Sequence, residues 1–172
     1  MKKFTLEDSG LIAKKLKSNG KKIGLCHGVF DIIHTGHIDH FEEVKKKCDY
    51  LFVTITEDKY VNKGPNRPVN NHFFRAKILK SLKQVDYVCV NYSEDAVKSI
   101  LEIKPDFYFK GKDYKGKRDL TLRLQKEKKA VQKIGGKIVF TQSPLKSSTE
   151  IYSEKRETPW VRLRRKSNPN EP

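Results

Sequence analysis

Apolar residues along the chain occur in short continuous runs that alternate with longer segments of helical periodicity. The runs are rich in β-branched and aromatic residues, which favour strands, while apolar positions three or four residues apart favour amphipathic helices. The pattern predicts five strands, at 22–26, 50–56, 87–90, 107–109 and 138–141. It also predicts helices, at 7–19, 35–47, from Asn70 or Asn71 to Leu82, from Ser93 to Ile103, through a charged segment to Lys133, and opening at 147–150.

Strands that alternate with helices are typical of α/β proteins with a parallel sheet. We therefore predict a Rossmann-like open sheet of five parallel strands with helices on both faces. One domain is expected over residues 1–156. Residues 157–172 are polar and basic and contain three prolines, so a disordered tail or linker is predicted there.

Composition narrows the class of protein without naming a ligand. The hydrophobic content of 36% is enough for a core, and neither a membrane span nor a signal-type segment is found, so a cytoplasmic protein is expected. The net charge of +16 attracts anions, a class that includes nucleotides, sugar phosphates and nucleic acids. The three cysteines are widely spaced, which predicts reduced, partly buried thiols and no disulfide framework or zinc ribbon.

Three loops carry the candidate chemistry. Ligands of open parallel sheets bind beyond the carboxyl ends of the strands. The segments 27–37, 110–114 and 142–149 follow predicted strands one, four and five and hold unusual polar residues. We therefore expect these loops to meet at one crevice.

His34 and His37 are three residues apart at the start of a predicted helix, so their rings share one side of its first turn. Free N–H groups and the helix dipole favour an anion there, and Gly36 lets a phosphate approach the backbone. The alternatives are two surface histidines at a helix end, or a metal site that adds His40. One ion could hardly reach all three, because position i+6 is rotated well round the helix.

Further motifs accompany these histidines. They are GVFDIIHTGH, the second strand with its end at Asp58, KGPNRPV, Arg75, PDFYFKGKDY, GGKIV and SSTEI, and together they cover about residues 22–156. The set resembles the HxGH nucleotidyltransferase superfamily, whose members include cytidylyltransferases and class I aminoacyl-tRNA synthetases. Within it, the set is most similar to the D-glycero-β-D-manno-heptose 1-phosphate adenylyltransferases and more distantly to glycerol-3-phosphate cytidylyltransferase.

The resemblance implies a HIGH-type nucleotidyltransferase fold, possible homodimerisation, and transfer of a nucleoside monophosphate to a small phosphorylated sugar or polyol with release of pyrophosphate. Mg²⁺ would enter with the triphosphate, since no dedicated carboxylate cage is found in the sequence. The resemblance implies catalytic roles for His34, His37 and Lys63, and contact with the second substrate for Arg67 and Arg75. The implied nucleotide-binding residues are Gly28, Val29, Phe30, Asp31, Gly36, Lys110, Gly111, Asp113, Ser147, Ser148 and Thr149.

Plainer interpretations remain for several of these residues. Lys63 and Arg67 also fit ordinary loop charges, 110–113 fits a plain turn, and Ser147 with Glu150 fits a capping box. The functional alternatives are a CTP-dependent cytidylyltransferase for a polyol or amino-alcohol phosphate, and a nucleotide- or RNA-binding protein without turnover. Gln142 replaces an arginine of the cytidylyltransferase pattern, which favours ATP over CTP. Nucleic acid is disfavoured because no stacking aromatics interleave with the basic runs.

Overall fold

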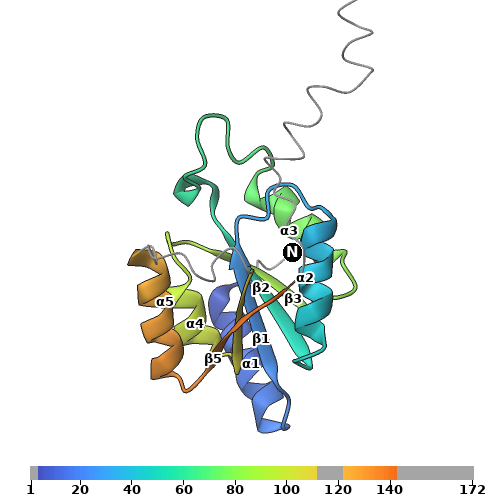
Figure 1. Ribbon diagram of the computed structural model, residues 1–172, viewed down its shortest axis with the longest axis vertical. Coiled ribbons are helices and arrows are strands. Elements are labelled where there is room, and N and C mark those ends of the chain that lie inside the picture. The colour runs from blue at the N-terminus through green and yellow to red at the C-terminus, as the bar shows by residue number, and fades with distance from the viewer. Residues whose placement is uncertain (1–3, 112–121, 143–172) are drawn as a thin grey trace, which may run out of the picture.

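The computed structural model describes residues 4–111 and 122–142. The five strands form one sheet in the order β3-β2-β1-β4-β5, and every neighbouring pair is parallel. The predicted Rossmann-like parallel sheet with helices on both faces is confirmed (Figure 1). The elements are α1 (Leu6–Ser18), β1 (Ile23–Gly28), α2 (Thr35–Lys45), β2 (Tyr50–Thr56), η1 (Asp58–Tyr60), α3 (His72–Lys80), β3 (Tyr87–Asn91), α4 (Val97–Ile103), β4 (Phe107–Lys110), α5 (Leu122–Lys133) and β5 (Lys137–Phe140).

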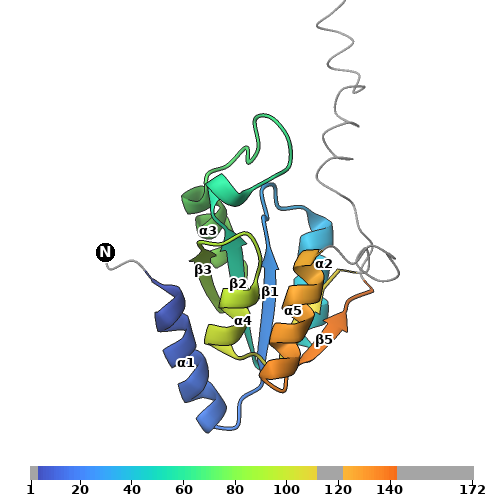
Figure 2. The same cartoon turned by 90° about the vertical axis from the view of Figure 1, so that its left-hand side faces the viewer.

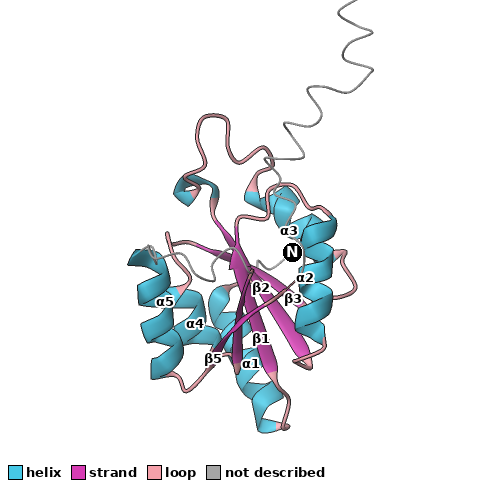
Figure 3. Ribbon diagram, in the orientation of Figure 1, coloured by secondary structure: helices cyan, strands magenta, loops and turns pink. Residues whose placement is uncertain are grey.

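Two cores lie on opposite faces of the sheet, because side chains alternate along each strand. On one face Leu25, Phe52 and Tyr108 pack against α1, α4 and α5; in Figure 2, α4 and α5 are in front of the sheet and α1 is at its left. On the other face Val53 and Phe109 pack against α2 and α3. The strands are therefore enclosed between two helical layers (Figure 3).

Strand β2 has the predicted bounds, because its apolar run is buried on both faces. Strand β1 is longer than predicted: His27 and Gly28 were expected in a turn but pair with Thr54 and Ile55. The His27 ring explains the difference, since Nδ1 lies 2.9 Å from the Thr54 hydroxyl and Nε2 lies 3.3 Å from that of Thr56.

Helix α4 begins at Val97, so the predicted start at Ser93 is wrong. The Asn91 side chain donates to the carbonyls of Ser93 and Asp95 at 3.1 and 2.8 Å, and the Ser93 hydroxyl donates to the Asp95 carbonyl at 2.8 Å. Asn91 is fully buried and holds residues 92–96 as a loop. Asn71, by contrast, is the N-cap of α3, as one of the two predicted alternatives stated.

Helices α2 and α3 each end two residues before the predicted positions, at Lys45 and Lys80. Their ends tighten into turns in which N–H groups reach back three residues, from Lys47 to Val44 at 2.9 Å and from Leu82 to Leu79 at 3.2 Å. The three cysteines are free, and all are buried, more fully than predicted. Within residues 4–111 and 122–142, no helix has the length and apolarity to cross a membrane.

Candidate active site

The loop between β1 and α2 has a special backbone at Phe30, whose φ of 50° lies in the left-handed region. The Phe30 ring is buried, with its centroid 5.5 Å from that of Phe41 and 5.4 Å from that of His37. A Cβ added at Gly28 would lie 3.1 Å from the Phe30 ring, so glycine leaves room for that ring at the strand end. The loop thus brings a buried aromatic ring under the predicted phosphate site.

The rings of His34 and His37 lie together at the start of α2, with centroids 3.9 Å apart and an interplanar angle of 36°. Both Nδ1 atoms are buried, and neither has a hydrogen-bond partner among the residues that the structure describes. His34 is the N-cap residue, yet its side chain makes no capping bond. The pair therefore presents unused polar atoms at the carboxyl edge of the sheet, where an anion was predicted.

Both histidines are neutral near pH 7. Burial lowers the pKa of His37 to about 3, and the charge of Lys63, together with those of His34 and His40 when they are protonated, adds to this effect. Burial also lowers the pKa of His34, with Lys63 as the second cause. A neutral imidazole carries one N–H donor. Each ring can therefore donate a hydrogen bond to a phosphate oxygen without first taking up a proton.

Lys63 lies in the long loop between η1 and α3, which rises above the strand ends in Figure 1. Its side chain is exposed, but surrounding protein partly desolvates the ammonium and lowers its pKa, and Arg67 adds to the shift. Since Lys63 lowers the pKa of both His34 and His37, its charge acts on the histidine pair. The three predicted catalytic residues are thus close enough to interact electrostatically.

Asp31 holds the same long loop in place. Its carboxylate accepts from Arg67 Nη1 at 3.0 Å and from the backbone N–H groups of Val69 and Asn70 at 2.9 Å each. Burial would raise the pKa of Asp31, but these three donors outweigh it and lower the pKa. Only 1% of the Asp31 side chain is exposed. The carboxylate predicted to contact the nucleotide is therefore a positioning group, and Arg67 is ion-paired with it.

Arg75 is fully buried, so the predicted substrate contact is replaced by a structural one. Its guanidinium donates to the carbonyls of Val29 and Thr56 at 2.5 and 2.8 Å and to Asp58 Oδ1 at 2.5 Å. Its Nε donates to the Asn70 carbonyl at 2.9 Å. One side chain thereby fixes the loops that leave β1 and β2 together with the start of α3.

Lys110 was predicted to contact the nucleotide but lies buried at the end of β4, with 7% of its side chain exposed. Its ammonium is 2.8 Å from Glu127 of α5 and 5.0 Å from the Tyr108 ring centroid. The other Glu127 oxygen accepts from the Ala96 N–H at 3.2 Å. This pair joins the end of β4 to the start of α4 and to the middle of α5, and Gly111 follows Lys110 directly in the sequence.

Two side chains of α2 hold the end of β5. His40 Nδ1 lies 2.7 Å from the Thr141 hydroxyl, and Glu43 accepts from the Gln142 N–H at 2.8 Å. His40 Nε2 lies 3.3 Å from Cys26 Sγ, so its ring bridges β1 and β5. His40 therefore serves the scaffold, and the metal interpretation that joined it to His34 and His37 is not supported. The helix that carries the histidine pair also fixes the exit of the last strand.

This geometry agrees with what comparison with known proteins shows. The model of the cytidylyltransferase-like family matches residues 25–154. The chain belongs to this family. As a cytidylyltransferase-like protein it is a nucleotidyltransferase, which confirms the predicted class of enzyme.

Several relatives of this cytidylyltransferase-like chain are bifunctional proteins HldE. Those of a Nitratiruptor species and of Aliarcobacter butzleri are both 40% identical to it, over 76% and 77% of this chain but 29% and 28% of their own lengths. The chain thus spans less than a third of these relatives.

Two solved structures share the fold. A lipopolysaccharide core biosynthesis protein from Thermoplasma volcanium is 30% identical, with a TM-score of 0.61, and the match covers 73% of this chain and all of that one. Pantoate-beta-alanine ligase from Francisella tularensis, at 19% identity, matches over 88% of this chain and 75% of its own with a TM-score of 0.55. The second comparison concerns the fold alone.

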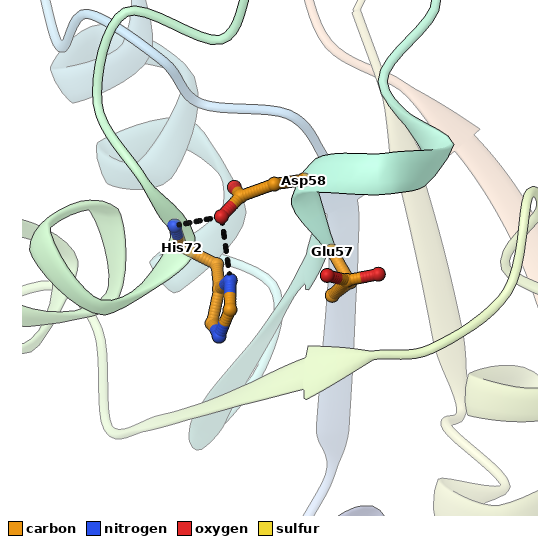
Figure 4. A group of neighbouring side chains, drawn as sticks. All are labelled: Glu57, Asp58 and His72. Atoms are coloured by element: carbon orange, nitrogen blue, oxygen red, sulfur yellow. Dashed lines mark hydrogen bonds and ion pairs between the residues drawn. The ribbon is translucent and has the colours of Figure 1, made fainter.

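One group of possible metal ligands occurs among the described residues of this nucleotidyltransferase: Glu57, Asp58 and His72, with ligand atoms within 4.8 Å of one another. Figure 4 shows the Asp58 carboxylate directed at His72, with Glu57 beside this pair and joined to neither residue by a hydrogen bond or ion pair. Asp58 Oδ2 accepts from the His72 N–H at 3.1 Å and lies 2.7 Å from Nδ1, while Oδ1 accepts from Arg75. Mg²⁺ prefers regular octahedral oxygen ligation. These residues fit it poorly, because both Asp58 oxygens already have donors.

The positioning residues were missed from the sequence for a common reason. Asp58, Glu127, His40 and Glu43 have partners that are between 14 and 101 residues away along the chain. The one usable signal was Asp58, which is part of the family resemblance. Four predicted nucleotide-binding residues lie outside the described residues: Asp113, Ser147, Ser148 and Thr149. The predicted final helix and the predicted tail lie there as well.

Proposed function

We propose that the enzyme transfers AMP from ATP to a sugar 1-phosphate, such as D-glycero-β-D-manno-heptose 1-phosphate, and releases pyrophosphate. The observation that carries this proposal is the pair of neutral imidazoles, each with a buried and unpartnered Nδ1 within the described part of the chain, beside the Lys63 charge. The family resemblance and the HldE relatives support a sugar phosphate as acceptor.

In the proposed reaction an oxygen of the acceptor phosphate attacks the α-phosphorus of ATP in line with the leaving group. The bond from the α-phosphorus to the bridging oxygen breaks, and pyrophosphate leaves with the electron pair. No side chain acts as nucleophile. His34 and His37 donate hydrogen bonds to the phosphate oxygens as charge builds up on them, and Lys63 neutralises the triphosphate. Mg²⁺ would be carried in with ATP, where it would supply positive charge that offsets the charge of the triphosphate.

The chain's own scaffold supplies the positioning that such a reaction needs. Arg75 fixes the exits of β1 and β2, and Asp31 fixes the loop that carries Lys63. His40 and Glu43 fix the exit of β5, after which the proposed phosphate-binding residues 147–149 follow. These contacts support a site in which the reacting groups are held by rigid elements.

Pyrophosphate release tests the proposal directly. The purified chain is incubated with Mg²⁺, each of ATP, CTP, GTP and UTP, and a panel of sugar 1-phosphates, glycerol 3-phosphate and phosphocholine. We expect the largest kcat/KM for ATP with heptose 1-phosphate. A preference for CTP with a polyol or amino-alcohol phosphate would replace the substrate assignment by the cytidylyltransferase alternative. Salt-sensitive RNA binding without any pyrophosphate release would contradict the assignment of substrates altogether.

A further inference from the structure

Glu57 directly follows β2 and has an unusual environment for a carboxylate. Its N–H donates to the Asn91 carbonyl at 3.1 Å, so the backbone is held between the exits of β2 and β3. Only 15% of its side chain is exposed. Its Oε2 is buried, and within the described part of the chain that atom has no hydrogen-bond partner. Lys59 provides an ion pair at 3.9 Å, which is longer than a hydrogen bond.

The position of Glu57 relates it to the proposed site. Gly28 and Ile55 are paired in the parallel register, so β1 and β2 leave the sheet at the same level. Arg75 binds the carbonyls of both Val29 and Thr56, which keeps the two exits side by side. In the order β3-β2-β1-β4-β5, β2 lies on the side of β1 opposite to β4. Glu57 is thus next to the phosphate loop, on the side away from the nucleotide loop proposed after β4.

An unpaired acceptor inside a protein is costly, because its desolvation is not compensated. Other buried carboxylates of this molecule are supplied with donors: Asp31 has three and Glu127 has two. Glu57 Oε2, by contrast, has no hydrogen-bond donor among the described residues, and it lies at the carboxyl edge of the sheet, where the substrates are proposed to bind. In Figure 4 no hydrogen bond or ion pair joins the Glu57 carboxylate to Asp58 or His72, so neither of these neighbours supplies the missing donor.

The local charge indicates which donor is missing. Lys59 already lies 3.9 Å from Oε2, and the chain carries a net charge of +16. A second cation at this point would be repelled, whereas a neutral hydroxyl would only add the missing hydrogen bond. We propose that Glu57 is a specificity-determining residue that accepts hydrogen bonds from hydroxyl groups of the acceptor sugar. This inference rests on the proposed sugar-phosphate transfer.

The test compares two variants of the full chain, Glu57→Met and Glu57→Gln, with wild type. Glu57→Met keeps the length of the side chain and removes both acceptors, while Glu57→Gln keeps one acceptor. We expect Glu57→Met to raise the KM for heptose 1-phosphate about 10- to 100-fold, the range for a hydrogen bond to a charged group. Glu57→Gln should give a smaller rise, and the KM for ATP should stay within about twofold of wild type in both variants.

The unfolding temperature separates this role from a structural one. If Glu57 only stabilised the fold, its replacement would lower the unfolding temperature. Without substrates, Glu57→Met should unfold at the same temperature as wild type or a higher one, because it removes a buried carboxylate oxygen without a hydrogen-bond donor. Glu102→Met is the matched control, since Glu102 is exposed in α4 and lies beside Gly10 of α1. It should change neither KM.

Each outcome decides between the two proposals. If wild type is active and Glu57→Met leaves the KM for heptose 1-phosphate unchanged, or raises the KM for ATP instead, Glu57 does not read the acceptor. A lower unfolding temperature for Glu57→Met would make Glu57 a structural residue and also overturn the inference. If wild type releases no pyrophosphate with any substrate pair, the proposed function fails first, and the role of Glu57 fails with it.

Discussion

The histidine pair and the Arg75 site lie at the same edge of the sheet, but their polar atoms are used in opposite ways. Arg75 is fully buried, and its guanidinium donates to three carbonyls and to Asp58. His34 and His37 are close together, and each leaves a buried Nδ1 without a partner among the described residues. A completed network stabilises the fold, whereas incomplete polar groups are suited to a ligand that completes them.

The largest effect is expected where the completed network is broken. Arg75→Met leaves Asp58 without its guanidinium and removes the donor to three carbonyls, so the free energy of unfolding should fall by about 3–5 kcal/mol. Urea unfolding measures the loss. Arg123→Met is the control, because Arg123 is 47% exposed and its nearest carboxylate, Glu94, is 3.8 Å away. Its effect should stay within about 0.5 kcal/mol. Equal losses in both variants would contradict a special role for Arg75.

Changes to the histidine pair should affect turnover and leave stability nearly intact. His34→Ala or His37→Ala removes one donor to the reacting phosphate, and kcat should fall about 10²- to 10³-fold. Pyrophosphate release at saturating substrates gives kcat, and urea unfolding of the same samples checks the fold. Turnover at the wild-type level in either variant would refute the proposed role of that imidazole. A large fall in the free energy of unfolding would instead mean that the two histidines, like Arg75, stabilise the fold.

The pH dependence of stability should sharpen the comparison further. Burial lowers the pKa of His37 to about 3, below the ordinary value of 6.5. Between these values the unfolded chain binds a proton that the folded chain does not, so stability decreases as pH falls from about 6.5 towards 3. At pH 5.5 the contribution of His37 is a loss of about 1.4 kcal/mol relative to pH 7.5.

His37→Asn should remove that loss. The measurement is urea unfolding of wild type and variant at pH 7.5 and 5.5, with the difference between the two pH values compared. His27 has a pKa lowered to about 3 by burial and remains in the variant, so part of the acid sensitivity persists. The same difference in wild type and variant would mean that His37 becomes protonated freely in the folded protein.

The smallest effect concerns the contact between α2 and β5. His40→Phe keeps a ring and removes the bond to Thr141, and should lower the free energy of unfolding by about 1 kcal/mol. Thr141→Val removes the other partner. In a double-mutant cycle the coupling between the two should be about 0.5–1.5 kcal/mol. Additive losses would show that the two side chains act independently.

Local patterns predicted the framework well and the long-range polar contacts poorly. The bounds of β2 follow from seven consecutive residues, six of them buried, and Asn71 caps α3 through an N–H only three residues away. These signals are local, so they can be read along the chain. The start of α4 was wrong because Ser93 resembles a cap, whereas Asn91 had already fixed the loop around it.

For the candidate site, too, local features were predicted from the sequence and long-range contacts were not. The position of the histidine pair follows from the first strand, the helix start and the spacing of the two residues. The roles of Asp31, Arg75 and Lys110 depend on partners that the fold brings near, so their charges indicated substrate contact while the structure pairs them within the protein. A charged residue in a sequence motif can thus contact a ligand or hold the loops around the ligand site, and its burial in the structure distinguishes the two roles.

Phe30 imposes two demands that no single replacement can meet. Its backbone, at a φ of 50°, would be most relaxed with glycine, while its packing against His37 and Phe41 requires a large ring. Glycine would relax the backbone but leave a space beside the His37 ring, and a β-branched residue would fill part of that space at a greater conformational penalty. Position 30, beside the proposed phosphate site, therefore tolerates few amino acids, although it touches no substrate atom in the proposed reaction.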